Sequence, residues 1–430
     1  MKIAIIGGGA AGMMAAAAAH EADGSAEIFV IEKNDGLGKK VIISGGGRCN
    51  LTTGIQDVKI VLTKYPRGGK FLSKAMHKFS PEDVYGWFEG HGVPLKVEED
   101  MRVFPKSNNG KDVVAVFEKM FRNPSIKILF NSQVEKVRRI PNGFEIFLKG
   151  KTIPLSADKL ILTTGGQAYR QTGSTGDGYA FAQTLGHSIT PLAPSLSSLE
   201  TKEKWVADLA GVSFPYAELS CRLERSEAES KDPSKKGPSA GSGRLSAAGP
   251  FIFTHRGLSG PAIFALSSQI AFQDISADHP LPISIDFIPD RKLSDVTESI
   301  LFHLAKYPKK SLSNVLAALV AKSVAFRVCL LLGMNPDASA NEYGKKDAER
   351  IAKTLKDLVL HAVSRSSGEE FVTAGGVELK EVDPSTMESK ICPGLYLAGE
   401  ILDIDGFTGG FNLQSAWSTG HLAGESAASL

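Results

Sequence analysis

The chain has 430 residues, of which 42% are hydrophobic and 22% charged, and its formal net charge is +2. This composition is typical of a globular protein with two or three domains. The low net charge argues against a broad phosphate-binding surface, and no apolar run reaches the ~18 residues of a membrane span. Because a strand begins at Lys2, we expect no signal peptide.

The four cysteines are scattered along the chain and form no CxxC pair. This spacing predicts neither a zinc site nor a dithiol redox pair, and it is typical of a reducing compartment. We therefore expect a cytoplasmic protein that holds no metal.

The first glycine cluster follows an apolar strand, residues 2–6, and precedes an alanine-rich segment, residues 10–19. This order predicts a strand, a glycine turn and a helix. Gly7 permits the tight turn, Gly9 allows backbone to approach a pyrophosphate, and Gly12 allows close packing of helix on strand. The helix N-terminus then offers free N–H groups to the phosphates.

A second strand, residues 27–31, ends at Glu32. The acid follows Gly12 by about 20 residues, the spacing of a carboxylate that accepts a ribose hydroxyl. The two strands, the glycine turn and the acid together predict a dinucleotide site in an α/β domain.

A second glycine-rich segment, Ser-Gly-Gly-Gly-Arg-Cys-Asn, occupies residues 44–50. Three consecutive glycines, the last of which is Gly47, would destabilise a helix or a strand. We therefore expect the backbone there to lie close against a ligand. Arg48 can neutralise a phosphate, assisted by Lys39 or Lys40. The alternative is a flexible loop.

Short apolar segments within residues 126–148 predict a small sheet or meander. Residues 158–164 predict a buried parallel strand that ends at Gly165-Gly166. The helix predicted after it has Gly186 near its C-terminus.

The pattern changes at Pro191. Residues 217–224 alternate as a half-buried strand does, residues 225–250 predict an exposed hairpin tip, and Ser259 is expected to cap a helix that starts at Pro261. From residue 293 to 363 the apolar period is helical. A strand-rich piece and a helical piece therefore interrupt the nucleotide domain.

The C-terminal tail returns to the first pattern. A short apolar strand ends at Gly399-Glu400, and Gly409-Gly410 precedes a predicted helix. Such a turn can aim N–H groups at an electron-rich ring and stabilise negative charge on it.

These motifs together resemble a known family. The resemblance rests on GGGAAG near the N-terminus, SGGGRCN, Thr164-Gly-Gly166, FTHRGLSGP, TAGGV and the tail GLYLAGEILDIDGFTGGFNLQSAWSTG. The sequence resembles the BaiN-like NAD(P)/FAD-dependent oxidoreductases, which include the aminoacetone oxidase-type bacterial flavoproteins, over nearly its whole length. The Gly176-Asp-Gly178 stretch and the tail are also similar to the fumarate reductase flavoproteins.

The resemblance implies an α/β fold, with a split Rossmann-like FAD-binding domain at residues 1–190 and 366–430. It also implies an inserted β-barrel subdomain at residues 191–290 and a helical subdomain at residues 291–365. The longer and more polar stretch at 225–250 departs from the family pattern.

The cofactor contacts that the resemblance implies follow the FAD molecule from end to end. Gly7, Gly9, Ala10, Ala11 and Gly12 face the pyrophosphate, Glu32 and Lys33 the adenosine ribose, and Val134 the adenine. Arg48, Cys49 and Asn50 approach the central part, Gly399 and Glu400 the pyrophosphate or ribitol, and Gly410, Asn412 and Leu413 the flavin ring. Lys39, Gly47 and Gly166 complete the predicted cofactor site.

His255 is the candidate catalytic residue, since it lies in a turn of the insert that could roof the flavin and an imidazole can donate a proton near neutral pH. The alternative is a histidine that only pins the turn by hydrogen bonds. Cys49 has a packing alternative as a small hydrophobe. Tyr169 and Arg170 could meet a substrate.

We expect an FAD-dependent oxidoreductase acting on a small or mid-sized organic substrate. It would either reduce an activated C=C bond with NAD(P)H or oxidise an amine with O₂. No second GxGxxG follows a strand, so NAD(P)H docks transiently or the substrate itself reduces the flavin. The alternative is a non-catalytic redox sensor or a partner-recruiting, RNA-associated flavoprotein, although the low net charge argues against nucleic acid as a partner.

Overall fold

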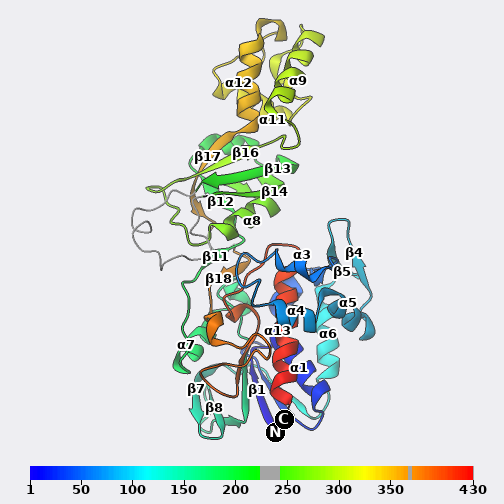
Figure 1. Ribbon diagram of the computed structural model, residues 1–430, viewed down its shortest axis with the longest axis vertical. Coiled ribbons are helices and arrows are strands. Elements are labelled where there is room, and N and C mark those ends of the chain that lie inside the picture. The colour runs from blue at the N-terminus through cyan, green and yellow to red at the C-terminus, as the bar shows by residue number, and fades with distance from the viewer. Residues whose placement is uncertain (223–242, 367–369, 430) are drawn as a thin grey trace. The chain divides into compact units, whose positions relative to one another are not determined.

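The computed structural model describes residues 1–222, 243–366 and 370–429. The chain forms two compact units (Figure 1). Unit 1 comprises Met1–Ser195 and Gly368–Leu430, and unit 2 comprises Leu196–Ser367. Among the described helices, none combines the length and the apolar composition that a membrane crossing needs.

Unit 1 is built on a parallel sheet of five strands in the order β19-β10-β1-β2-β6. The strands are β1 (Lys2–Ile6), β2 (Glu27–Ile31), β6 (Ile126–Leu129), β10 (Lys159–Leu162) and β19 (Leu395–Leu397). The central strands are continuous apolar runs because both faces of a parallel sheet are covered.

Strand β6 differs from the sequence prediction, which placed it in the small meander. It pairs in parallel with β2, with Ile28 opposite Ile126. As the edge strand it keeps a partly exposed face, and this produces the alternating pattern that resembles an antiparallel strand.

Helices α1 (Ala10–Ala22) and α13 (Phe411–Ala428) pack side by side (Figure 1). A Cβ atom at Gly420 would collide with the carbonyl oxygen of Ala11, and one at Gly424 with that of Ala15. Ala11 lies against Gly420 and Ala15 against Gly424, so residue numbers increase in the same direction along both helices and the helices run parallel. Because Ala11 is near the start of α1 and Gly420 is well inside α13, the N-terminus of α13 extends about 12 Å further.

We expect Gly424→Ala to destabilise the protein by about 1–3 kcal/mol, because the added methyl overpacks the contact between the two helices. Gly86→Ala is the matched control, since Gly86 lies in helix α5 (Pro81–Gly90) with no atom within 4 Å of an added Cβ. That control should stabilise by about 0.5–1 kcal/mol. Urea unfolding of both variants measures the difference, and equal effects of the same sign would contradict the packing argument.

The rest of unit 1 consists of small sheets and helices around the parallel sheet. The sheets are β3 (Thr52–Thr53) with β5 (Arg102–Pro105) and β4 (Leu95–Val97); β7 (Val134–Ile140) with β8 (Gly143–Leu148) and β9 (Leu155–Ala157); and β11 (Ala193–Ser195) with β18 (Val372–Ala374). The helices are α2 (Lys39–Ile43), α3 (Val58–Leu62), α4 (Ser73–Lys78), α6 (Gly110–Met120) and α7 (Asp177–Thr184).

Unit 2 contains a closed barrel in the order β12-β15-β14-β13-β16-β17. Its strands are β12 (Leu199–Thr201), β13 (Ser213–Arg222), β14 (Arg244–Phe253), β15 (Gly257–Ser259), β16 (Leu281–Asp286) and β17 (Leu358–Arg365). Its helices are α8 (Pro261–Gln269), α9 (Leu293–Lys306), α10 (Leu312–Leu316), α11 (Lys322–Leu331) and α12 (Lys345–Lys356). One hydrophobic core runs through the barrel and the helical piece.

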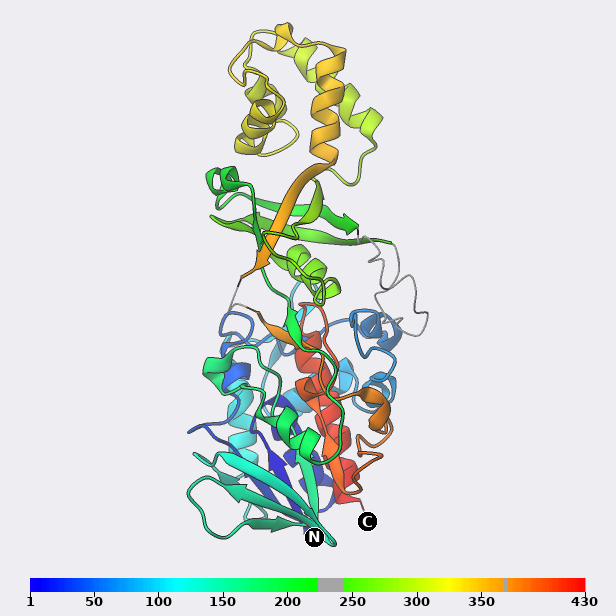
Figure 2. The same ribbon diagram turned by 90° about the vertical axis from the view of Figure 1, so that its left-hand side faces the viewer.

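Three local predictions in unit 2 differ from the structure. The helical period predicted through residue 363 ends at Lys356, and β17 then closes the barrel; Figure 2 shows the orange helix α12 running into this strand. Residues 244–250 belong to β14, whereas residues 225–242 of the predicted hairpin tip lie outside the described residues. Ser259 ends β15, and Gly260 is the residue that caps α8.

Candidate functional site

The first glycine turn and the start of α1 form an anion-binding geometry. Gly7 has φ +108°, and a Cβ there would lie 2.6 Å from the carbonyl oxygen of Thr163. Gly9 caps α1 without any side-chain hydrogen bond, and the first helical bond runs from Met13 N to Gly9 O (2.9 Å). The N–H groups of Ala10, Ala11 and Gly12 therefore precede the helical ladder.

The space beside this turn is open. A Cβ atom at Gly9 would meet no atom within 4 Å, and the first turn of α1 contains no acidic residue. A helix N-terminus with these properties fits a pyrophosphate.

The Glu32 carboxylate is 8% exposed and connects two loops. One oxygen accepts from Gly8 N–H (2.7 Å), and the other accepts from the backbone and side-chain N–H groups of Asn34 (2.8 and 2.7 Å). A carboxylate offers about four lone-pair sites. Glu32 thus keeps capacity for a ribose hydroxyl while it also holds the glycine turn.

Lys33 and Val134 flank this position. The Lys33 ammonium binds Asp177 (2.8 Å) and the Thr175 hydroxyl (2.6 Å), so it fixes the start of α7. Val134 is buried at the start of β7, opposite Leu148.

The second helix N-terminus of the candidate site belongs to α13, and its cap also makes no side-chain hydrogen bond. Gly410 caps it with φ +90°, and a Cβ there would collide with the backbone of Thr52. The first helical bond runs from Gln414 N to Gly410 O (2.9 Å), which leaves the N–H groups of Asn412 and Leu413 ahead of the ladder. The Asn412 side chain holds Gly406 through both its N–H and its C=O (2.8 Å each).

Asn50 joins the glycine-rich loop to this helix. Its carboxamide is satisfied when its oxygen accepts from Gly410 N–H (2.9 Å) and its nitrogen donates to Thr52 O (3.2 Å). A Cβ atom at Gly46 or Gly47 would meet no atom within 4 Å, so this backbone is open to a ligand.

Arg48 and Cys49 have structural partners. Arg48 pairs with Glu98 (2.8 Å) and lies 3.9 Å from the centre of the Phe104 ring. Cys49 is fully buried, and burial raises the pKa of its thiol to about 12, so the thiol stays protonated at neutral pH.

The two lysines before this loop differ in a way that the sequence does not reveal. Lys39 pairs with the exposed carboxylate of Asp35 (2.7 Å). Lys40 pairs with the partly buried Glu400 (2.6 Å), whose other oxygen accepts from Thr373 N–H (2.9 Å). A Cβ at Gly166 would lie 2.8 Å from Glu400, so the structure gathers these residues and adds Lys40 and Thr373 to the predicted site.

Gly399 connects this cluster with α1. Its N–H donates to the Thr419 hydroxyl of α13 (3.0 Å), and a Cβ on it would lie 2.8 Å from the Ala11 methyl.

Near Glu400 lies a set of buried polar atoms that sequence reasoning missed. The Tyr179 hydroxyl, the Thr164 hydroxyl and Asp403 Oδ1 have no hydrogen-bond partner among the described residues. Burial raises the pKa of both Tyr179 and Asp403, and the charges of Glu400 and Asp403 add to the effect on Tyr179. Unpartnered buried polar atoms are rare, so this set fits the polar groups of a bound molecule.

The remaining candidates are Tyr169, Arg170 and His255. Tyr169 packs on Phe371 in unit 1 (ring centres 5.7 Å apart), and the exposed Arg170 donates to Gln167 (2.9 Å). His255 is exposed in the turn between β14 and β15 of unit 2. Among the described residues, no three His, Cys, Asp or Glu side chains are placed to hold a metal ion.

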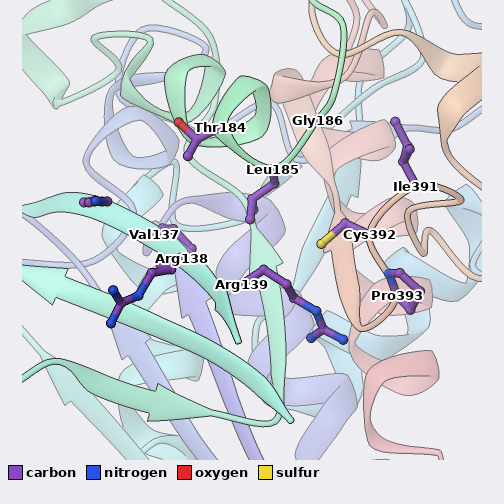
Figure 3. A pocket seen from close by; sticks show the side chains of 10 residues that line it. Val137, Arg138, Arg139, Thr184, Leu185, Gly186, Ile391, Cys392 and Pro393 are labelled. Carbon is purple, nitrogen blue, oxygen red and sulfur yellow. The ribbon is translucent and has the colours of Figure 1, made fainter. Parts of the chain in front are cut away.

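A separate pocket of about 620 Å³ lies in unit 1 (Figure 3). Its lining comes from β7, the end of α7 and the loop at residues 391–393, and includes Lys136, Arg138 and Arg139. None of the predicted cofactor residues lines it.

Comparison with known proteins extends these observations. The chain matches the family described as HI0933-like protein Rossmann domain over residues 1–426. It is 32% identical over 428 residues to the 3-dehydro-bile acid delta(4,6)-reductase of Clostridium scindens, covering 99% of both chains. It is 28% identical over 422 residues to the ribosomal RNA dihydrouridine synthase of Escherichia coli, covering 96% of this chain and 95% of the relative.

Among solved structures, the chain resembles the E. coli quinol fumarate reductase subunit FrdA with a TM-score of 0.50 and 14% sequence identity. The match covers 100% of this chain and 70% of that subunit. At this identity the likeness concerns the fold.

The prediction that nucleic acid is not a partner is wrong. The E. coli relative and one from Haemophilus influenzae, 28% identical over 426 residues, are both named for ribosomal RNA. The prediction rested on the net charge of the whole chain, and a sum over 430 residues does not report how charge is distributed over the surface.

The family match over residues 1–426, the Rossmann-like sheet and the glycine-led N-termini of α1 and α13 agree with one another. The chain belongs to the HI0933-like Rossmann-domain family, the BaiN-like flavoprotein oxidoreductases that its sequence motifs resemble.

Proposed function

We propose that the protein is an FAD-dependent reductase that adds two hydrogens across a C=C bond conjugated to a carbonyl group. The observation that carries this proposal is the chemistry shared by the names of its relatives. A 3-dehydro-bile acid with double bonds at positions 4 and 6 is a conjugated ketone. Forming dihydrouridine saturates the uracil C=C bond that is conjugated to a ring carbonyl.

The geometry of unit 1 supports FAD as the cofactor. The pyrophosphate fits the N-terminus of α1, the adenosine ribose fits Glu32, and the flavin ring fits the N-terminus of α13. The two helices run parallel with their N-termini about 12 Å apart along the axis, which suits an extended dinucleotide. When bound, FAD supplies the hydride chemistry.

The chain's own groups provide binding and charge. The positive end of α13 favours negative charge on a ring placed beside it. Lys40 and Thr373 hold Glu400, and the charge of Glu400 acts on Tyr179, whose buried hydroxyl is unpartnered. These two groups suit the ribityl hydroxyls. His255 donates the proton that accompanies the hydride, and a reduced nicotinamide that docks transiently is the reductant.

Two alternatives use the same cofactor site. One is amine oxidation with O₂ as acceptor, and the other is a non-catalytic redox sensor or partner-recruiting flavoprotein. Because the Cys49 thiol is buried and protonated, neither alternative can use it for thiol–disulfide exchange with the flavin.

Anaerobic turnover tests the proposal. The FAD-loaded protein is mixed with NADPH or NADH and with cyclohexenone, a steroid dienone or an oligouridylate. We expect oxidation of the nicotinamide to match formation of a product that carries two additional hydrogens by mass spectrometry. Flavin reduction followed by reoxidation only with O₂, without a reduced product from any acceptor, would favour the alternatives.

A further inference from the structure

The charge of the chain is unevenly distributed. The segment between β16 and β17, residues 287–357, contains twelve Lys and Arg against eight Asp and Glu. It therefore carries a net charge of +4, while the rest of the chain carries −2.

Five lysines of this segment gather at one end of the helical piece. Lys306 ends α9, Lys309 and Lys310 follow it, and Lys345 and Lys346 begin α12. Helices α9 and α12 pack together and are joined by a loop contact from Ala340 N–H to Lys310 O (2.9 Å). We call these five lysines, with Phe302 and Tyr307, the basic tip. Helices α9 and α12 are the yellow-green and orange helices in Figure 2.

The lysines of the basic tip are exposed, and no ion pair links them to a carboxylate of the described residues. The nearest acids along the chain are already bound to backbone N–H groups: Glu342 to Ser339 (3.1 Å) and Asp347 to Gly344 (3.0 Å). The five ammonium groups are therefore available to phosphates.

Aromatic rings lie among these charges. The Phe302 side chain is 59% exposed, and the Lys306 ammonium lies 5.4 Å from its ring centre. The Lys310 ammonium lies 4.0 Å from the ring centre of Tyr307. Lysines that serve solubility alone need no exposed phenylalanine beside them, whereas cations with aromatic faces are the features that recognise unpaired nucleotides.

We propose that the basic tip binds RNA, with the lysines on phosphates and Phe302 stacked on an unpaired base. The inference rests on the proposed function, in which the C=C bond of a uridine base in RNA is one of the bonds that the protein reduces. The basic tip would hold the strand that carries this base, through contacts that do not require turnover.

Fluorescence anisotropy of the FAD-loaded protein with a labelled 20-nucleotide oligouridylate, without reductant and over a salt series, tests the surface. Changing Lys309, Lys310, Lys345 and Lys346 to Glu should weaken binding at least about tenfold and lower the slope of log K against log salt by about 3. The matched control changes Lys59, Lys74, Lys119 and Lys149 to Glu, four exposed lysines of unit 1. It should leave the slope nearly unchanged.

Phe302→Ala tests stacking separately and should weaken binding about fivefold to a hundredfold. It also decides the question if the charge-reversed variant fails to fold. No binding by the wild type, equal losses in both lysine variants, or equal affinity for polyglutamate or phosphatidylglycerol vesicles would overturn the proposal.

Reduction of cyclohexenone separates this proposal from the proposed function. The variants of the basic tip should reduce cyclohexenone at the wild-type rate. If the wild type reduces no conjugated bond but binds RNA through the basic tip, the proposed function is wrong and the RNA-binding surface is supported. If it reduces a conjugated bond but its RNA binding does not depend on the basic tip, the proposed function is supported and the RNA-binding surface is wrong.

Discussion

Replacing His255 with alanine is expected to slow reduction of a conjugated C=C bond by roughly 10²–10⁴-fold, the usual contribution of a general acid. FAD content should stay normal, because His255 belongs to unit 2 and the residues proposed to bind FAD belong to unit 1. Rapid mixing separates the two half-reactions. Flavin reduction by NAD(P)H should be unchanged, and reoxidation by the conjugated substrate should be slow.

The hydrogen bonds of the turn argue against the alternative in which His255 pins the turn. Thr254 fixes the turn, since its N–H donates to Gly257 O (2.8 Å) and its hydroxyl accepts from Gly257 N–H (3.1 Å). The His255 side chain is exposed and makes no hydrogen bond to the described residues. His279→Ala, another exposed histidine of unit 2, is the matched control. Equal rates in the two variants would leave His255 without a chemical role.

Glu32→Ala should weaken FAD binding by about a hundredfold to a thousandfold, or roughly 3–4 kcal/mol. Two effects combine, because the substitution removes the proposed ribose acceptor and also leaves the Gly8 N–H without its partner (2.7 Å). The glycine turn then loses the support that aims it at the pyrophosphate. Titration of the apo-protein with FAD, followed by flavin fluorescence, gives the affinity.

Glu32→Gln separates the two effects. The amide keeps one acceptor oxygen but turns an N–H₂ group toward Gly8 N–H or toward the N–H groups of Asn34. We expect an intermediate affinity with near-normal thermal stability. Wild-type affinity in both variants would show that the ribose is recognised elsewhere.

The elements that the sequence predicted correctly are those defined by glycine backbone geometry. The strand, glycine turn and helix at residues 2–22 and the glycine turn before α13 appear as expected, because only glycine satisfies their close approaches. Strand β17 was not predicted. Leu358 and Val359 continue the apolar spacing of α12, so the local pattern predicts more helix. The segment forms a strand instead because it closes the barrel between β16 and β12.

Side-chain partners could not be predicted because they join distant segments. In the sequence Arg48 looks free to meet a phosphate, but in the structure it pairs with Glu98. Lys33 looks free to meet the adenosine ribose, but it pairs with Asp177. Nothing local distinguishes Lys39 from its neighbour Lys40, which reaches Glu400 across 360 positions of the chain. The prediction against nucleic acid as a partner rested on the low net charge of the whole chain. That total does not reveal the basic segment of unit 2.

The parallel packing of α1 on α13 has a consequence for biosynthesis. Helix α1 is synthesised before unit 2, while the glycines that fit against Ala11 and Ala15 are synthesised after it. Throughout synthesis of the barrel, which is made from one continuous stretch, the alanine face of α1 has no native cover. The nucleotide-binding half therefore reaches its native packing only after the half that interrupts it has been made.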